Sequence, residues 1–436
     1  MILWVVIGAA YLSATPISLE EVKTESRRNV QAVNAELDRA RATASTAGVR
    51  SAALPQLQLY SSDGLTVAGR QRVIQPTTLP DGGVLIGPTD IPPYSNPQLS
   101  LGVALNQILF DWGRWKQIAQ AGSQEEASRG QAVEQLQFAE YEGVRRFFAL
   151  YSAQRSLAVL EANATRSQQL VDRAQALFTA GRGSRSDVLA SQVNLNNDRI
   201  TAVRQHTAIT QTSADLSAWL ARPETEELDA VEPPGLDGTP IPPPSLEEAL
   251  NTARSSRPLL KVVAAQLKAS DLGVEVAKSG YLPRLTLSVN YSRSGVSANP
   301  VFTDPTRQNS ATGTVNLAWD FFNGLATLAA ARGAEAVRTQ AQNTLDQTVR
   351  DVEGSIRIGR TTLEISITVL RMSKENQQTA ALGLTAAQAR FSAGAGSTLE
   401  VRDAQLKLAQ ADLSLLQSRV DVEVARASLA RLTGSI

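Results

Sequence analysis

The sequence contains no cysteine, and this absence excludes several kinds of protein at once. Disulfides, thiolate nucleophiles, cysteine-ligated zinc and a lipid anchor on an N-terminal cysteine all require that residue. The chain has one histidine, His206, and two methionines, which are too few for a histidine-rich metal centre or a methionine ladder. We therefore expect no bound metal and no cofactor.

An excess of charge of either sign is also lacking. Lys and Arg together number 42, and Asp and Glu together number 42, so the formal net charge is zero. Such a balance gives no electrostatic reason to expect a nucleic-acid partner. There is no nucleophile-elbow sequence, and the glycine-rich segments 181–183 and 394–396 neither follow a strand nor precede a Lys-Ser/Thr pair. We expect no catalytic residues, and we interpret His206 as an ordinary polar position on a helix.

Long apolar runs are scarce as well. Residues 2–14 form an apolar run of the length of a signal-peptide core, too short for a membrane-spanning helix. We predict a signal peptide at residues 1–14, although no Lys or Arg precedes the run. No run of about 18 apolar residues exists elsewhere, so a membrane crossing by this chain would require a closed β-barrel.

What the chain does contain is an internal repeat. Three segments recur in the same order: Ser-Leu-Glu-Glu at 18–21 and 245–248, Leu-Pro at 54–55 and 282–283, and Phe-x-Ala-Gly at 178–181 and 391–394. Recurrence in a constant order indicates a tandem duplication. We predict two structural repeats, 15–221 and 245–436, joined by an extended Pro-rich linker at 222–244.

Each repeat predicts the order helix, strand, long loop, strand, very long helix, glycine turn, helix. Apolar residues alternate with small polar residues in four segments, beginning near residues 57, 99, 285 and 315. This pattern is typical of strands with one apolar and one polar face, and each is about ten residues long, enough to cross a tilted bilayer path. Segments 112–178 and 324–391 lack proline and predict helices on the order of 100 Å long.

Heptad spacing indicates how such long helices pack. The last helix carries three rows: Val401, Leu408, Leu415, Val422 and Leu429; Ala404, Ala411, Ser418 and Ala425; and Leu399, Leu406, Leu413 and Val420. Its counterpart in the first repeat keeps one row: Val188, Leu195, Ala202, Ile209 and Leu216. Apolar rows on two flanks predict a helix with two neighbours, as in a closed ring of helices.

Strand number limits the possible assemblies. A spanning barrel needs at least about eight strands, so four strands cannot close one, whereas three copies of four would supply twelve. The main alternative is a soluble or periplasmic coiled-coil scaffold, because long helices suit both. The alternating strands and the export-like N-terminus favour the membrane protein.

Taken together, these segments resemble the TolC-like outer membrane efflux protein family. The resemblance rests on the duplicated glycine turn, on Arg257-Pro258-Leu259 opening a helix, on Leu-Pro-Arg-Leu at 282–285, and on Leu-Phe-Asp-Trp-Gly-Arg at 109–114. It covers nearly all of the mature chain, and the order of the motifs carries more weight than any one of them.

The resemblance implies a mainly α fold with a small β part. In this family three chains close a 12-stranded β-barrel in the outer membrane of a Gram-negative-type cell, and coiled-coil helices form a periplasmic α-barrel tunnel. The implied function is a passive exit duct of a tripartite efflux pump or type I secretion system, without enzymatic activity. The implied partners are two further copies, a periplasmic adaptor protein, an inner-membrane pump and outer-membrane lipid.

The resemblance also assigns roles to residues. It implies that the two glycine turns form the tip that meets the adaptor: Gly181, Arg182, Gly183, Ser184 and Asp187 in the first, and Gly394, Ala395, Gly396 and Ser397 in the second. It implies that Glu400 and Asp403 form a cation-sensitive gate. Gly396 stands where some members carry a basic gate partner, so a salt-bridged lock at that position is not expected.

Overall fold

The computed structural model describes residues 15–78, 80, 82–223, 226–236, 238–303 and 309–436. The signal peptide predicted at 1–14 lies outside these residues. The chain divides into two compact units. Unit 1 comprises residues up to 41, 126–265 and 342–436, and unit 2 comprises 42–125 and 266–341.

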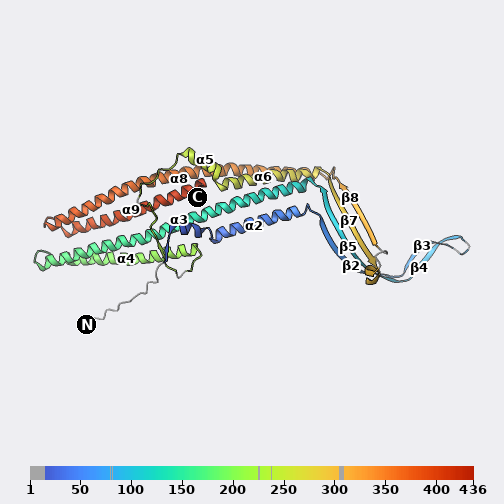
Figure 1. Cartoon of the computed structure of the whole chain (residues 1–436), viewed down its shortest axis with the longest axis horizontal. Coiled ribbons are helices and arrows are strands. Elements are labelled where there is room, and N and C mark those ends of the chain that lie inside the picture. Colours follow the sequence, from blue (N-terminus) through green and yellow to red (C-terminus); the bar gives the residue numbers. More distant parts are fainter. Residues whose placement is uncertain (1–14, 79, 81, 224–225, 237, 304–308) are drawn as a thin grey trace, which may run out of the picture. The chain divides into compact units, whose positions relative to one another are not determined.

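Helices account for most of the described chain. They are α1 (Leu19–Ser26), α2 (Val30–Ser51), α3 (Trp112–Thr179), α4 (Arg185–Trp219), α5 (Leu246–Ser256), α6 (Pro258–Lys278), α7 (Ala298–Thr303), α8 (Ala326–Ser392) and α9 (Thr398–Thr433) (Figure 1). The two longest, α3 with 68 residues and α8 with 67, confirm the proline-free segments as continuous helices. None of the described helices combines the length and the apolar content that crossing a membrane requires.

Unit 1 contains most of two helical hairpins, α3–α4 and α8–α9, one from each repeat (Figure 1). The first part of α3, up to residue 125, and of α8, up to residue 341, belongs to unit 2. Its largest apolar cluster joins Phe147, Phe148 and Leu150 of α3 to Leu216 of α4. A parallel pair of short strands, β1 (Thr15–Ile17) and β6 (Leu228–Ala230), packs on this cluster through Ile17 and Leu228. The linker predicted as merely extended therefore contributes a strand to the core.

The predicted heptad rows are largely buried. Val401, Leu408, Val422 and Leu429 of the first row are buried, as are Ala411, Ser418 and Ala425 of the second. In the third row Val420 is buried, whereas Leu399 and Leu406 are exposed. The exposed members show that one flank of α9 finds no neighbour within the described chain.

Unit 2 is built around a four-stranded antiparallel sheet in the order β2-β5-β7-β8. The strands are β2 (Gln56–Ala68), β5 (Tyr94–Phe110), β7 (Arg284–Gly295) and β8 (Asn309–Ala318) (Figure 1). These are the four alternating segments of the sequence, and β5 with 17 residues is well beyond the expected length. β2 and β8 are the two edges of the sheet.

The two faces of this sheet differ as the alternation predicts. Cross-strand partners share a face, so Leu57, Leu105 and Val289 lie on one side in register. On the other side the Tyr60 hydroxyl donates to Asn290 Oδ1 at 3.0 Å, and the Ser288 hydroxyl donates to Asn106 Oδ1 at 2.9 Å. The polar face is internally hydrogen-bonded, whereas the apolar face carries exposed leucines such as Leu57 and Leu59.

The loops between the strands hold elements that the sequence reading missed. Between β2 and β5 the chain forms a hairpin of β3 (Gln71–Thr78) and β4 (Val84–Ile91), which make a separate two-stranded sheet. Between β7 and β8 it forms the short helix α7. The count of four strands per chain was thus right for the main sheet and too low for the whole.

Each repeat begins with the same helix cap. Ser18 accepts from the Glu21 backbone N–H and Glu21 accepts from the Ser18 backbone N–H, which is a capping box. Ser245 and Glu248 form the same pair in the second repeat. These hydrogen bonds lower the pKa of Glu21 and of Glu248 below the ordinary glutamate value.

Candidate functional site

The turns that close the two hairpins have the same backbone geometry. Gly181 has φ +73° and Gly394 has φ +76°, a region that L side chains rarely adopt. In the first turn the Arg182 N–H donates to the Leu177 carbonyl at 2.9 Å, and in the second the Ala395 N–H donates to the Arg390 carbonyl at 3.0 Å. Both bonds satisfy carbonyls left free at a helix end, as in a Schellman motif.

A second glycine in each turn is required for a different reason. A Cβ on Gly183 would lie 3.0 Å from the Phe178 backbone nitrogen, and one on Gly396 would lie 2.9 Å from the Phe391 nitrogen. Backbone atoms at that distance cannot move aside cheaply. The glycine at 396 therefore has a steric explanation, in addition to leaving no basic side chain there.

Serine caps the helix that follows each turn. The Ser184 hydroxyl accepts from the Ser186 N–H at 3.1 Å, and the Ser397 hydroxyl accepts from the Glu400 N–H at 3.2 Å. Asp187 and Glu400 occupy the same place, three residues after the cap. An acidic side chain in the first turn of a helix is favoured by the helix dipole, so both carboxylates have a local structural role.

Glu400 and Asp403 are exposed on α9, and each faces a basic side chain of the same chain. Arg390 Nε lies 3.8 Å from Glu400 Oε2, and Lys407 Nζ lies 2.7 Å from Asp403 Oδ2. These partners were not identified from the sequence. Exposed pairs of this kind contribute little to stability, about 0–1 kcal/mol, and both carboxylates stay available to other charges.

A buried ion pair joins the two hairpins near their turns. Arg402 of α9 makes two parallel hydrogen bonds to Asp198 of α4, at 2.6 and 2.9 Å. The Ser167 hydroxyl of α3 donates to Asp198 at 2.5 Å and accepts from Arg402 at 3.0 Å. Asp198 and Arg402 are 8% and 9% exposed, so the pair is almost entirely removed from solvent.

The sequence reading missed this pair. Its signal was an aspartate three residues after Leu195 of the heptad row, at a position that a coiled coil reserves for small or apolar side chains. Periodicity marks such an exception but does not name the partner, which lies 204 residues away.

Apolar and aromatic contacts surround the ion pair. Leu170 of α3 packs with Leu384 of α8 and with Val401 and Leu408 of α9. Closer to the turns, Arg173 donates to the Ser392 hydroxyl at 2.6 Å, and its guanidinium lies 5.5 Å from the Phe391 ring. We call this packing of α3 and α4 against α8 and α9 the internal seam. It holds both glycine turns at the same end of unit 1.

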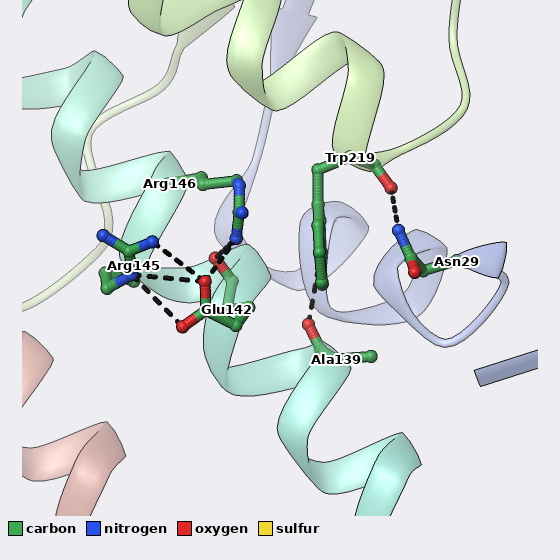
Figure 2. A network of polar contacts seen from close by, with 6 residues as sticks. All are labelled: Asn29, Ala139, Glu142, Arg145, Arg146 and Trp219. Carbon is green, nitrogen blue, oxygen red and sulfur yellow. Dashed lines mark hydrogen bonds and ion pairs between the residues drawn. The ribbon is translucent and has the colours of Figure 1, made fainter. Parts of the chain in front are cut away.

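A second charged network joins α3 to the last residue of α4, Trp219 (Figure 2). Glu142 accepts from Arg145 and Arg146, and the Arg146 guanidinium lies 4.0 Å from the Trp219 ring centroid. Trp219 Nε1 donates to the Ala139 carbonyl at 3.3 Å. Burial would raise the pKa of Glu142, but the hydrogen bonds from Arg145 and Arg146 outweigh it, and its pKa lies below the ordinary value.

Two helix faces of unit 1 carry exposed apolar side chains at helical spacing. On α4 they are Leu189, Val193, Ile200 and Val203, and on α8 they are Ile358, Ile365, Val369 and Met372. At 100° per residue the α4 set faces away from Asp198, and the α8 set faces away from the buried Ile356 and Leu363. We call these two sets the outer flanks.

The requirements of a metal site and of a phosphate-binding loop can be compared with the described residues. Within the described part of the chain, no three His, Asp or Glu side chains gather as a metal site requires. His206 is exposed on α4. The glycine turns connect helix to helix, so they differ from phosphate-binding loops, which follow strands.

Comparison with known proteins agrees with this architecture. The sequence profile of the family described as "Outer membrane efflux protein" matches residues 22–222 and 249–435, one segment in each repeat. The chain is 25% identical over 344 residues to the outer membrane efflux protein BepC of Brucella suis biovar 1 (strain 1330), covering 77% of this chain and 72% of BepC. It is 22% identical to the outer membrane protein TolC of Vibrio cholerae serotype O1, covering 96% of this chain and 91% of TolC.

A solved structure supports the same fold. The outer-membrane channel OprN superposes with a TM-score of 0.78 at 18% identity, over 96% of this chain and 90% of that chain. The match spans both repeats and therefore confirms the duplicated, mainly helical architecture. Because the family profile covers most of the sequence, the chain belongs to the outer membrane efflux protein family and is an outer-membrane efflux channel of the TolC type, with no enzymatic role.

Proposed function

We propose that three copies of this chain form the exit duct of a tripartite efflux pump or type I secretion system. The observation that carries this is the four-stranded sheet, which has two free edges and an exposed apolar face in the described chain. A lone open sheet of this kind is unstable in lipid, because its edge N–H and C=O groups have no partner. Three sheets of four strands supply the twelve that a closed barrel of this family uses.

The outer flanks support the same ring. Within one chain the internal seam already joins the α3–α4 hairpin to the α8–α9 hairpin. The exposed apolar flanks of α4 and α8 have no partner within the described chain. Packing the α4 flank of one copy against the α8 flank of the next is a head-to-tail contact, which closes into a ring when the rotation allows.

In this proposal the mature chain consists of repeats 15–221 and 245–436 with the linker 222–244, after removal of residues 1–14. The strands lie in the outer membrane in contact with its lipid, and the helices extend through the periplasm. The glycine turns form the inner tip, where Gly181–Asp187 and Gly394–Ser397 meet a periplasmic adaptor tied to an inner-membrane pump. Their shared backbone geometry supports a role that both repeats perform.

At the tip, Glu400 and Asp403 of three copies would form a ring of six carboxylates. Such rings attract cations and are a recurring means of cation selectivity. Arg390 and Lys407 offset part of that charge within each chain, so we expect a weaker cation preference than bare carboxylates would give.

Three measurements test the proposal. The mass of the detergent-solubilised protein should be that of a trimer, and a stable monomer in the membrane fraction would contradict the assembly. A soluble scaffold would instead be found outside the membrane fraction.

For the gate, replacing Glu400 and Asp403 with Ala should reduce cation selectivity and block by divalent cations in planar-bilayer recordings. Unchanged selectivity would mean that Glu400 and Asp403 do not line the conduction path. Asp187→Ala, on the other turn, is the matched acidic control.

A further inference from the structure

The β3–β4 hairpin carries an apolar face with no partner among the described residues. In its register Ile74 lies opposite Pro88, and Pro76 lies opposite Ile86. Cross-strand partners project to the same side, so these four residues and Val84 share one face. Ile74, Ile86 and Val84 are 77%, 72% and 64% exposed.

Such a hairpin is not expected to be stable alone. A two-stranded ribbon in water is at best marginally stable, and here its larger apolar side chains face solvent. The single ion pair on this face, Arg72 Nε to Asp90 Oδ1 at 3.6 Å, lies beside the apolar set and joins the two strands to each other. An apolar partner would therefore fit this face. A charged partner would find no unpaired charge on it.

The backbone of the hairpin argues against one kind of partner. Pro76 and Pro88 have no N–H group, and proline is tolerated in strands where its nitrogen faces the outer edge. An added strand would find a missing donor on each edge. Association is therefore favoured through the apolar face and disfavoured through the edges.

The position of the hairpin in the chain favours a second copy of this chain as its partner. The hairpin connects β2 to β5, and β2 is a free edge of the main sheet. In the proposed trimer, on which this inference rests, the next copy joins at that edge. Three identical hairpins then leave the same end of the barrel around one axis, at the high effective concentration of linked groups.

We propose that the β3–β4 hairpins of the three copies pack their apolar faces together and form a collar at the outer mouth of the channel. The occupant of each face is thus a second copy of this chain. The collar differs in position and chemistry from the glycine turns, because it lies where β2 ends and its only charged side chains among the described residues, Arg72 and Asp90, pair with each other beside the apolar set.

The natural absence of cysteine allows a direct test. The variant Ile74→Cys places a thiol on the apolar face, and Gln75→Cys places one on the opposite face of the same strand. Both are purified as trimers of verified mass, oxidised, and separated under denaturing conditions. We expect covalently linked pairs of chains with Ile74→Cys, and about tenfold fewer with Gln75→Cys because only the first thiol lies in the collar.

Each outcome decides something. Absence of a trimer overturns the proposed assembly and the collar with it. A trimer in which neither variant links, or in which both link equally, overturns the collar and leaves the exit duct intact. If the hairpins insert into lipid instead, Ile74→Cys will react with a membrane-soluble maleimide and form no linked pairs. Ile86→Cys, on the facing strand, repeats the test if Ile74→Cys fails to accumulate.

Discussion

The internal seam and the outer flanks are both helix surfaces of unit 1, yet they differ in chemistry. The seam is buried and contains the hydrogen-bonded Asp198–Arg402 pair among apolar layers. The flanks of α4 and α8 carry exposed apolar side chains at helical spacing. The seam is formed by two hairpins of the same chain, whereas the flanks have no partner within the described chain.

The difference indicates how pairing errors are avoided. A bidentate buried ion pair tolerates one register and one partner, because any other arrangement leaves a charge unpaired in the interior. Apolar stripes accept many partners, so in the proposed trimer the geometry of the ring would have to select one. The buried ion pair therefore makes the seam specific for one arrangement of the two hairpins within the chain.

The largest expected effect comes from breaking the ion pair on one side. Arg402→Met leaves Asp198 buried without its partner, which typically costs about 3–5 kcal/mol. We expect a marked fall in the midpoint at which heat abolishes the helical circular dichroism of the solubilised protein.

The double variant Asp198→Leu with Arg402→Met separates stability from specificity. Replacing a whole buried pair by apolar side chains is often neutral or stabilising, so the midpoint should recover. A double variant as unstable as the single one would mean that the hydrogen bonds themselves, including those from Ser167, hold the seam.

A charge on an outer flank should act on assembly and spare the folded chain. In Ile365→Lys on α8, an unpaired ammonium would be buried at each junction of the ring, at a cost of about 2 kcal/mol or more. We expect fewer trimers by mass measurement with normal helical content. Thr201→Lys, exposed on α4 away from the flank, is the control, and a trimer that survives Ile365→Lys unchanged would place the copy–copy contact elsewhere.

Sequence periodicity predicted the buried rows of α4 and α9, but it made no prediction for the outer flanks of α4 and α8. The rows through Val188 and Val401 correctly named buried positions, because heptad spacing fixes a helix face. The row through Leu399 was mixed, since spacing cannot tell whether the neighbour belongs to the same chain. Asp198 and Arg402 were missed for a related reason: each has a local pattern, but their contact depends on how distant helices meet.

The sheet was more predictable than the loops. Alternation named all four main strands because one face must be apolar and the other polar. The β3–β4 hairpin was read as a loop, since Pro76, Pro88 and the glycines at 82 and 83 are typical breakers of strands. The glycine turns were predicted between the long helices, and the structure has them there, with Gly181 and Gly394 at positive φ. Their roles in adaptor docking remain predictions.

Substituting Gly394 tests whether the conformation of the turn is determined by its own backbone or by the internal seam beside it. Gly394→Ala keeps open space around the new Cβ but holds an L residue at φ +76°, at a cost of about 1–2 kcal/mol. Gly383→Ala, in mid-helix with equally open space, should instead stabilise by up to about 1 kcal/mol. Thermal midpoints that move in the same direction would mean that the turn rearranges freely.

A bulky side chain at the same position tests the proposed role of the turn in export. Gly394→Trp should impair export while the trimer persists.

The smallest expected effect is the pH dependence of stability that arises from the Glu142 network. This network joins α3 to α4 within the first hairpin, whereas the Asp198–Arg402 pair joins the two hairpins to each other. The pKa of Glu142 is lowered in the folded protein, so its contribution to stability is present above the ordinary value of 4.5 and is lost as pH falls through the lowered value. The contribution is on the order of 1 kcal/mol, because the group is mostly but not wholly removed from solvent.

Glu142→Gln should therefore lower the thermal midpoint at neutral pH, and the difference from the natural chain should shrink below pH 4.5, where the protonated acid resembles the amide. Glu364→Gln, which alters an exposed pair with Arg360, is the control and should change little at any pH. A Glu142→Gln difference that stayed constant with pH would show that Arg145 and Arg146 hold the amide as firmly as the carboxylate, and that charge at this position contributes nothing to the packing of the hairpin.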